Sequence, residues 1–200
     1  MANQKSDFEY LKWILNHDFL CEDKERMKEL KEVKDKSAQI VQIRKGYGVS
    51  DYELYEFGSK ENFRLLPFFN RTNNHPKLPD APSHLIAFCD YIILAEFKNS
   101  LYIILVEMKR GETAHAKIQL QASRMFMDYV LQSAERIKNH NSMENFDSRK
   151  VNFRRIVLSY TTKETLNSHF PKNDKKGYAP DKNDIINYET SNYFDIREVI

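Results

Sequence analysis

Three charged residues lie at the ends of two strongly apolar stretches of the chain. Asp90 precedes the first stretch, and Glu107 and Lys109 end the second, within the sequence CDYIILAEFKNSLYIILVEMKR. Two carboxylates are a common ligand set for Mg²⁺, which takes hard oxygen donors and keeps several of its waters. A lysine two residues beyond the second carboxylate can reach a water or a phosphate oxygen at the same place. These residue types therefore indicate metal-assisted hydrolysis of a phosphodiester.

The two apolar stretches have the pattern of a β-hairpin. Residues 88–97 and 100–109 are rich in β-branched, aromatic and long aliphatic side chains, and Lys98-Asn99 separates them as a turn. Around that turn the numbers of paired residues sum to 197, so Asp90 lies opposite Glu107. Opposed residues share a face of the sheet and side chains alternate along each strand, so Asp90, Glu107 and Lys109 are expected on one face. The same face carries five apolar residues: Phe88, Ile92, Leu94, Ile103 and Leu105.

Two carboxylates on an apolar face need a physical explanation. They repel each other at a Cβ separation of about 5 Å, and burial disfavours keeping both ionised. A bound divalent cation removes both penalties. The alternative is that Glu107, Lys109 and Arg110 form a solubilising strand exit and that Asp90 is a chance neighbour. The tripeptide Glu-x-Lys alone carries no weight, because it also occurs within the charged stretch 22–38.

The motif of Asp90, sixteen intervening residues and Glu107-Met108-Lys109 resembles the PD-(D/E)xK nuclease superfamily, which has the restriction-endonuclease-like fold. Cys89 stands where the name of the motif has proline. The resemblance implies that Asp90, Glu107 and the Met108 carbonyl bind Mg²⁺ or Mn²⁺. It also implies that Lys109 orients or helps to deprotonate the attacking water, or stabilises the transition state.

Many members of the superfamily carry a supporting glutamine on the helix that follows the second carboxylate. Gln119 and Gln121 lie ten and twelve residues after Lys109, close to the start of such a helix. Either one can orient Lys109 or the water, and exposed glutamines beside an apolar stripe are an equal alternative. An additional upstream carboxylate often joins such sites, and the candidates are Glu53, Glu56 and Glu61.

Basic residues near these positions would contact the phosphate backbone. They lie close to the expected helix or on the later strand: Arg110, Lys117, Arg124, Arg154 and Arg155. Such groups give a salt-dependent affinity without reading sequence. The net charge of +2 excludes a globally polycationic chain, so ordinary surface charge balanced by acids is the alternative.

The rest of the pattern supplies the elements that must hold the site. An amphipathic helix is expected over residues 7–20 and a solvated charged helix over 22–38. Strands are expected at residues 39–44, 52–57 and 151–160. The longest helix, Thr113–Lys138, carries an apolar stripe of Ile118, Ala122, Met125, Phe126, Tyr129 and Val130.

These elements predict an α/β fold close to the α+β type. Its core is restriction-endonuclease-like, a central mixed β-sheet flanked by helices, with an N-terminal helical extension. Residues 1–200 are expected to form a single nuclease domain. Within it, residues 1–38 form the helical N-terminal part, about 50–160 the catalytic core that the resemblance covers, and 163–200 a C-terminal extension with a small strand or helix.

Composition excludes several other classes. Cys21 and Cys89 form no CxxC motif, and Cys/His clusters of the zinc type, phosphate loops, dinucleotide turns and Gly-x-Ser-x-Gly elbows do not occur. The longest apolar run is Leu101–Val106, and no signal peptide is expected from the polar stretch MANQKSDFEY. A cytoplasmic protein with reduced thiols and no membrane contact is expected.

The expected function is a metal-dependent nuclease that hydrolyses phosphodiester bonds, with Mg²⁺ or Mn²⁺ as the cofactor and DNA preferred to RNA. The resemblance implies restriction, phage defence or repair as the setting. It implies a homodimer or a larger defence or repair complex as the assembly. The alternatives are an RNase on the same fold and a non-catalytic nucleic-acid- or protein-binding module that retains the fold.

Overall fold

The computed structural model describes the chain in ten ranges: residues 6–15, 20–21, 28–34, 37–56, 88–109, 114–140, 146–160, 180–181, 184–190 and 193–200. Two of the predicted site residues, Glu61 and Arg110, lie outside these ranges. Within them the chain forms mixed α/β structure with two sheets and two α-helices. Two short 3₁₀ turns, η2 (Ser148–Lys150) and η3 (Ile196–Glu198), complete the described elements.

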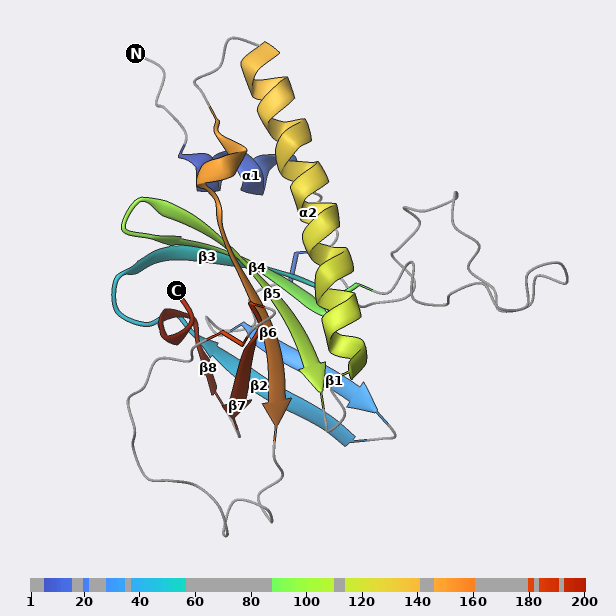
Figure 1. Ribbon diagram of the computed structural model, residues 1–200. Helices are drawn as coiled ribbons and strands as arrows, with labels where there is room; N and C mark the ends of the chain where they lie inside the picture. Colours follow the sequence, from blue (N-terminus) through green and yellow to red (C-terminus); the bar gives the residue numbers. More distant parts are fainter. Residues whose placement is uncertain are drawn as a thin grey trace, which may run out of the picture.

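A five-stranded mixed sheet lies at the centre, in the order β3-β4-β5-β6-β7 (Figure 1). Its strands are β3 (Val49–Glu56), β4 (Tyr91–Phe97), β5 (Ser100–Lys109), β6 (Asn152–Tyr160) and β7 (Ile186–Thr190). β3, β4 and β5 are antiparallel neighbours, whereas β6 runs parallel to β5 and β7 parallel to β6. Helix α2 (Ala114–His140) makes the crossover that a parallel β5–β6 pair requires.

The β4–β5 hairpin has the predicted register. Tyr91 pairs with Val106 and Phe97 with Ser100, so the numbers of each pair add to 197. Lys98 and Asn99 both have positive φ, at 49° and 61°, as a two-residue turn of type I′ requires. One step beyond the last pair, the register places Asp90 opposite Glu107, as the sequence predicted.

The two faces of the central sheet are covered by different layers. Helices α1 (Asp7–Ile14) and α2 pack on one face, where Ile92, Leu94 and Ile103 are buried against them. A three-stranded sheet in the order β1-β2-β8 covers the other face. Its strands are β1 (Glu29–Lys34), β2 (Ser37–Arg44) and β8 (Tyr193–Asp195). The prediction that helices flank the sheet therefore holds for one face only.

Strand β1 contradicts the charged helix predicted over residues 22–38. It pairs antiparallel with β2 along its whole length, from Glu29–Gln42 to Lys34–Ser37. On its other edge, the Tyr91 hydroxyl accepts from Lys31 N at 2.8 Å and donates to Lys31 O at 2.9 Å. Helix propensity differs by less than about 1 kcal/mol per residue among ordinary residues, so strand pairing and tertiary contacts override it here.

Helix α1 ends earlier than the predicted residue 20. Ser6 caps its first turn by accepting from Glu9 N at 3.2 Å, and the backbone is already extended at Leu15. Leu20 then pairs with Tyr55 in an isolated antiparallel bridge beside β3. Leu20 therefore pairs with the edge strand β3 of the central sheet and does not extend the helix. At the other end of the chain, β7 and β8 each join one of the two sheets, so the described part of the C-terminal extension belongs to the core.

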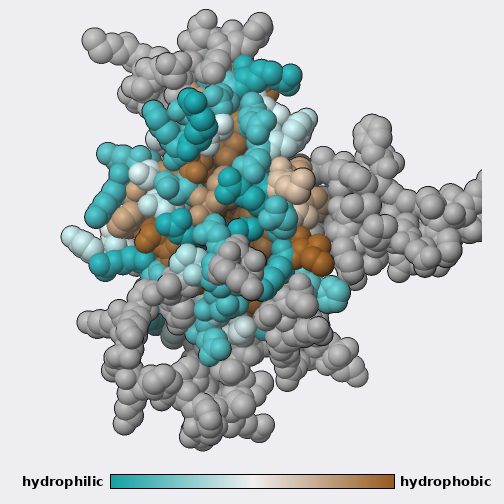
Figure 2. Space-filling model, in the orientation of Figure 1, coloured by the Kyte–Doolittle hydropathy of each residue, from teal (hydrophilic) through white to brown (hydrophobic). Residues whose placement is uncertain are grey.

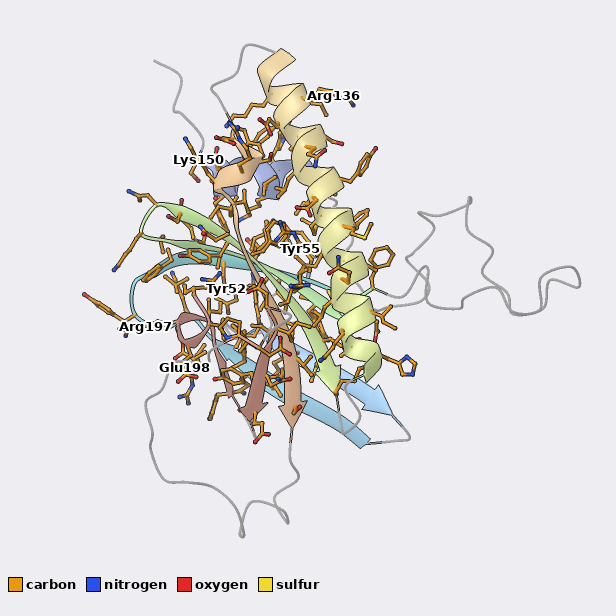
Figure 3. All side chains as sticks on the ribbon, viewed as in Figure 1. Tyr52, Tyr55, Arg136, Lys150, Arg197 and Glu198 are labelled. Atoms are coloured by element: carbon orange, nitrogen blue, oxygen red, sulfur yellow. The ribbon has the colours of Figure 1, made fainter. Side chains whose placement is uncertain are left out.

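Helix α2 confirms the predicted long helix but turns a different face to the sheet. Three residues of the predicted stripe point away from it: Ile118, Met125 and Tyr129 are 45%, 65% and 69% exposed. Phe126 and Val130 of the same stripe are partly buried against the core. Hydrophobic residues accordingly reach the surface on the α2 side of the molecule (Figure 2), and Arg136 projects outward near the end of the same helix (Figure 3). The residues that pack on the sheet are Ala116, Leu120, Ser123, Met127, Leu131 and Ala134.

Both stripes of α2 have helical spacing, so the period of the sequence does not distinguish them. The sheet-facing stripe contains three small residues, Ala116, Ser123 and Ala134, which let the helix approach the sheet closely. Over the part of the chain that the structure describes, neither helix is long and apolar enough to cross a membrane.

Candidate active site

Asp90 and Glu107 contact each other at the open end of the β4–β5 hairpin. The main-chain N–H of Asp90 donates to Glu107 Oε2 at 3.1 Å, and the N–H of Met108 donates to Asp90 Oδ2 at 2.7 Å. Each carboxylate therefore accepts from the backbone of the opposite strand. These two bonds lie one step beyond the Tyr91–Val106 pair, the last backbone pair of the hairpin. They set the position of each carboxylate relative to the other strand.

Glu107 is buried in an electrostatic environment that disfavours its charge. Its exposed fraction is 1%, whereas Asp90 is partly exposed. Burial, and then the negative charge of Asp90, raise the pKa of Glu107 to about 7 against the opposing effect of Lys109. A side chain this buried does not solubilise a strand exit. A strongly perturbed carboxylate with a specific charged neighbour is instead typical of functional sites.

Lys109 is held between Glu107 and helix α2. Its Nζ lies 2.5 Å from Glu107 Oε1 and donates to Gln119 Oε1 at 3.2 Å. The side-chain amide nitrogen of Gln119 in turn donates to the Phe88 carbonyl oxygen at 3.2 Å. The ammonium group therefore has a defined position beside the Glu107 carboxylate, on the face that the alternation of side chains predicted.

Of the two predicted glutamines, the structure places Gln119 at the site and Gln121 away from it. Residues two apart on an α-helix point about 200° apart around its axis, so the two cannot share a flank. The Gln121 side chain lies on the opposite flank, where its Oε1 accepts from Arg155 Nη1 at 2.9 Å. Gln121 therefore does not orient Lys109, because its side chain contacts Arg155 instead.

The backbone before Asp90 is anchored to α2 through Ser123, a residue that the sequence did not single out. The N–H of Cys89 donates to Ser123 Oγ at 2.7 Å. Ser123 could have been found from the sequence as the polar residue in the buried stripe of α2. It was missed because the other stripe of the helix was predicted to face the sheet. Burial raises the pKa of the neighbouring Cys89 thiol to about 12, so the thiol stays protonated at neutral pH and is not a nucleophile.

Neither of the described upstream carboxylates joins the site. Glu53 pairs with Leu94, which lies four residues along β4 from Asp90, or about 13 Å away. Glu56 pairs with Tyr91 and therefore shares its face, which is the face covered by the three-stranded sheet. The candidates Glu53 and Glu56 are thus excluded by position, and Glu61 lies outside the described residues.

Glu53 instead ties α1 to the sheet through a buried cluster of charges. Its carboxylate lies 2.6 Å from Lys12 Nζ and also accepts from Lys28 Nζ, and both Glu53 and Lys28 are buried. Burial acts to raise the pKa of Glu53, but the hydrogen bonds from Lys12 and Lys28 outweigh it and hold the pKa below its ordinary value. Glu53 is therefore a structural carboxylate.

We expect Glu53→Gln to lower the free energy of unfolding by about 2–4 kcal/mol at pH 7, because it leaves two ammonium groups beside a neutral amide. The folded-state pKa of Glu53 is depressed, so its contribution is present above the unfolded pKa of about 4.3 and is lost as the pH falls through the folded value. Urea unfolding should therefore show a gap between the two proteins that narrows below about pH 4.3. A gap that is independent of pH would contradict this account, and Glu56→Gln, an exposed position on the same strand, is the control.

Three of the predicted phosphate-contacting cations lie where α2 meets β6. Arg124 stacks on the Phe153 ring, with its guanidinium carbon 3.4 Å from the ring centroid. Each of the three has a carboxylate partner, so this flank carries little net charge. The pairs are Lys117–Asp181 at 3.7 Å, Arg124–Asp128 at 2.9 Å and Arg155–Asp184 at 3.6 Å.

Arg154 does not belong to this group. It neighbours Arg155 on β6, and neighbouring side chains on a strand point to opposite faces. Its Nε donates to the Val199 carbonyl oxygen at 2.8 Å near the C-terminal end of the chain. Arg154 and Arg155 therefore cannot contact one stretch of nucleic-acid backbone together at this site.

The oxygen donors at the site fit a hard divalent cation. The carboxylates of Asp90 and Glu107, and the Met108 carbonyl that the resemblance adds to them, are ligands of the kind that Mg²⁺ and Mn²⁺ prefer. A cation here would also offset the repulsion that raises the pKa of Glu107. Among the residues that the structure describes, no third His, Cys, Asp or Glu joins the pair. Such a set suits Mg²⁺, which keeps several waters, better than a closed zinc site.

The chain brings this site together from three separate segments: the entry to β4, the end of β5 and the first turns of α2. Comparison with known protein families, with curated proteins and with solved structures found no match.

Proposed function

We propose that this protein is a metal-dependent nuclease of the PD-(D/E)xK type that hydrolyses phosphodiester bonds in DNA. The observation that carries the proposal is the arrangement of Asp90, Glu107 and Lys109. The two carboxylates are fixed against each other by the backbone, and an ammonium group lies 2.5 Å from the buried one. A structural role alone gives no reason to place two carboxylates on opposed residues at the end of an apolar face.

The order of elements supports the same proposal. The antiparallel strands β3, β4 and β5 are followed by α2 and by β6, which returns parallel to β5. A hairpin, a helix and a strand in this order are what the resemblance implies for the nuclease core. The site lies where β5 passes into α2, so the helix that makes the crossover also supplies the support for Lys109 through Gln119.

Asp90, Glu107 and the Met108 carbonyl would hold Mg²⁺ or Mn²⁺. The ion, when bound, makes water easier to deprotonate and stabilises negative charge on phosphate oxygens. Lys109 would donate to the attacking water or to a phosphate oxygen, from a position set by Glu107 and Gln119. Attack of water on phosphorus in line with the scissile bond breaks the P–O3′ bond, and the departing 3′ oxygen takes up a proton. The products are a 5′-phosphate and a 3′-hydroxyl.

The choice of DNA, and of restriction, phage defence or repair in the cytoplasm as the setting, follows from the resemblance. A homodimer or a larger complex would suit a duplex, which has two strands to cut. The ion pairs near α2 should lower the affinity for a nucleic acid, because its phosphates would have to displace Asp128, Asp181 and Asp184 from their basic partners. Affinity for DNA should therefore be modest and fall with salt.

A cleavage assay on plasmid, linear duplex, single-stranded DNA and RNA tests the proposal. Each substrate is incubated with Mg²⁺, with Mn²⁺ and with EDTA. We expect cutting of DNA that needs the metal and is abolished by EDTA. Cutting of RNA but not of DNA would mean that the protein is an RNase and that the proposed substrate is wrong. Absence of cutting on all substrates with both metals, at high protein concentration, would overturn the proposal and favour a binding module.

A further inference from the structure

The peptide unit between Phe88 and Cys89 is held at both of its polar groups by side chains of α2. Its carbonyl oxygen, on Phe88, accepts from Gln119 Nε2 at 3.2 Å. Its N–H, on Cys89, donates to Ser123 Oγ at 2.7 Å. Gln119 and Ser123 are four residues apart and therefore lie on the same side of the helix. Two side chains one turn apart thus bind the two polar groups of one peptide plane, which lies one residue before the Cys89–Asp90 peptide.

Packing does not explain a serine at this position. Ser123 is fully buried in a stripe that otherwise consists of Ala, Leu and Met. A buried hydroxyl is unfavourable unless it has partners, and alanine would fill nearly the same volume without that penalty. The Ser123 hydroxyl has a partner in both directions, because it accepts from the Cys89 N–H and donates its proton to the Gln119 carbonyl oxygen at 2.9 Å.

We propose that Gln119 and Ser123 form a peptide clamp that sets the position of Asp90 relative to Lys109, an inference that rests on the proposed nuclease function. Gln119 links the two halves of the site, since its amide nitrogen donates to the Phe88–Cys89 peptide and its amide oxygen accepts from Lys109 Nζ at 3.2 Å. Ser123 is a positioning residue: it acts on Asp90 through the Cys89 N–H.

The clamp controls the contacts that align the two carboxylates. The Asp90 N–H donates to Glu107, and the Asp90 carboxylate accepts from the Met108 N–H. A displacement of the 88–89 peptide moves Cys89 and with it the Cys89–Asp90 peptide, whose N–H makes the first contact and whose position places the Asp90 side chain for the second. A misplacement of about 1 Å at a reacting centre lowers rates by about 10²-fold.

Kinetics of the Ser123→Ala protein on plasmid DNA test the clamp. We expect kcat to fall by about 10- to 100-fold, with the KM for DNA unchanged because Ser123 is buried away from any substrate. The Mg²⁺ concentration that gives half-maximal activity should rise, since Asp90 is a proposed ligand. Hydrogen exchange at the Cys89 amide should become faster, which reports the loss of the clamp without reference to activity.

Two further variants separate positioning from stability. Ser123→Thr keeps a hydroxyl that can bond the carbonyl one turn back, so kcat and the Mg²⁺ dependence should return towards wild type. Ala134→Gly lies on the same buried face of α2 and weakens the helix without touching the clamp. It should lower the melting temperature and leave kcat and the Mg²⁺ dependence unchanged.

The two ways in which this experiment can fail are distinct. If the wild-type protein cuts DNA and Ser123→Ala keeps its kcat and its Mg²⁺ dependence, the clamp is wrong and the nuclease stands. If the wild-type protein cuts no nucleic acid with either metal, the nuclease is wrong and the catalytic role of the clamp falls with it.

Discussion

Replacement of Glu107 by glutamine is expected to lower the rate of DNA cleavage by at least about 10³-fold while leaving the fold intact. The amide oxygen of glutamine can still accept from the Asp90 N–H, which Glu107 Oε2 does at 3.1 Å. What is lost is the negative charge that faces Lys109 and would bind the divalent cation. A 10³-fold loss corresponds to about 4 kcal/mol of transition-state stabilisation.

The same change should have little effect on stability. It removes a buried carboxylate whose pKa is raised to about 7 and relieves its repulsion by Asp90, although it also removes the ion pair with Lys109. We therefore expect the free energy of unfolding without metal to change by less than about 1 kcal/mol. Stabilisation by Mg²⁺ in thermal unfolding should disappear together with the activity.

Two glutamine substitutions on β3 serve as matched controls for Glu107→Gln. Glu56→Gln changes an exposed carboxylate on the opposite face and should retain both activity and the Mg²⁺ shift. Glu53→Gln should lower stability through the loss of its pairs with Lys12 and Lys28, yet the folded protein should still cut DNA. A Glu107→Gln protein that cuts DNA at the wild-type rate would remove Glu107 from the site.

The β4–β5 hairpin could be predicted from the sequence because its determinants are local. Lys98-Asn99 occupies the two turn positions with positive φ, and the apolar strands on either side fix the register. The face shared by Asp90, Glu107 and Lys109 follows from that register alone. This is why the part of the site that lies on the two strands was predicted in the correct arrangement.

The elements that were predicted wrongly depend on contacts with distant parts of the chain. Residues 29–34 favour a helix locally, but β2 pairs with one edge of this segment and the Tyr91 hydroxyl binds the other. Helix α2 is apolar on two sides, and the side with Ala116, Ser123 and Ala134 is the one buried in the folded protein. Neither outcome is encoded in the periodicity of the segment itself.

The helical half of the site could be predicted only in part for the same reason. Gln119 and Gln121 are equivalent in the sequence until the buried face of α2 is known. Once Ser123 faces the sheet, Gln119 lies on the flank beside Phe88 and Lys109, and Gln121 lies on the flank beside Arg155. The orientation of one helix therefore decides which glutamine supports the lysine and brings Ser123 into the site.

Replacement of Lys109 by alanine is expected to lower the cleavage rate by about 10²- to 10⁴-fold, within the range of a positioned group that assists proton transfer or stabilises charge. Lys109 is not one of the proposed metal ligands, so Mg²⁺ should still stabilise the variant in thermal unfolding. Persistence of the Mg²⁺ shift without activity would distinguish Lys109 from Glu107, whose replacement should remove both. Lys109→Arg should not restore the rate, because a single ammonium nitrogen contacts both Glu107 and Gln119, and the longer, planar guanidinium cannot reproduce that geometry.

Lys98→Ala is the matched control, since Lys98 is an exposed lysine at the turn of the same hairpin, at the end opposite to Asp90. It should retain the wild-type rate and Mg²⁺ dependence. Binding of DNA to the Lys109→Ala protein should weaken only slightly, because a single cation contributes little to the total affinity for a phosphate backbone. Full activity in Lys109→Ala would exclude this lysine from the reaction and leave the carboxylate pair as a metal site of another kind. Loss of the Mg²⁺ shift together with activity would instead mean that Lys109 acts by holding Glu107 in place.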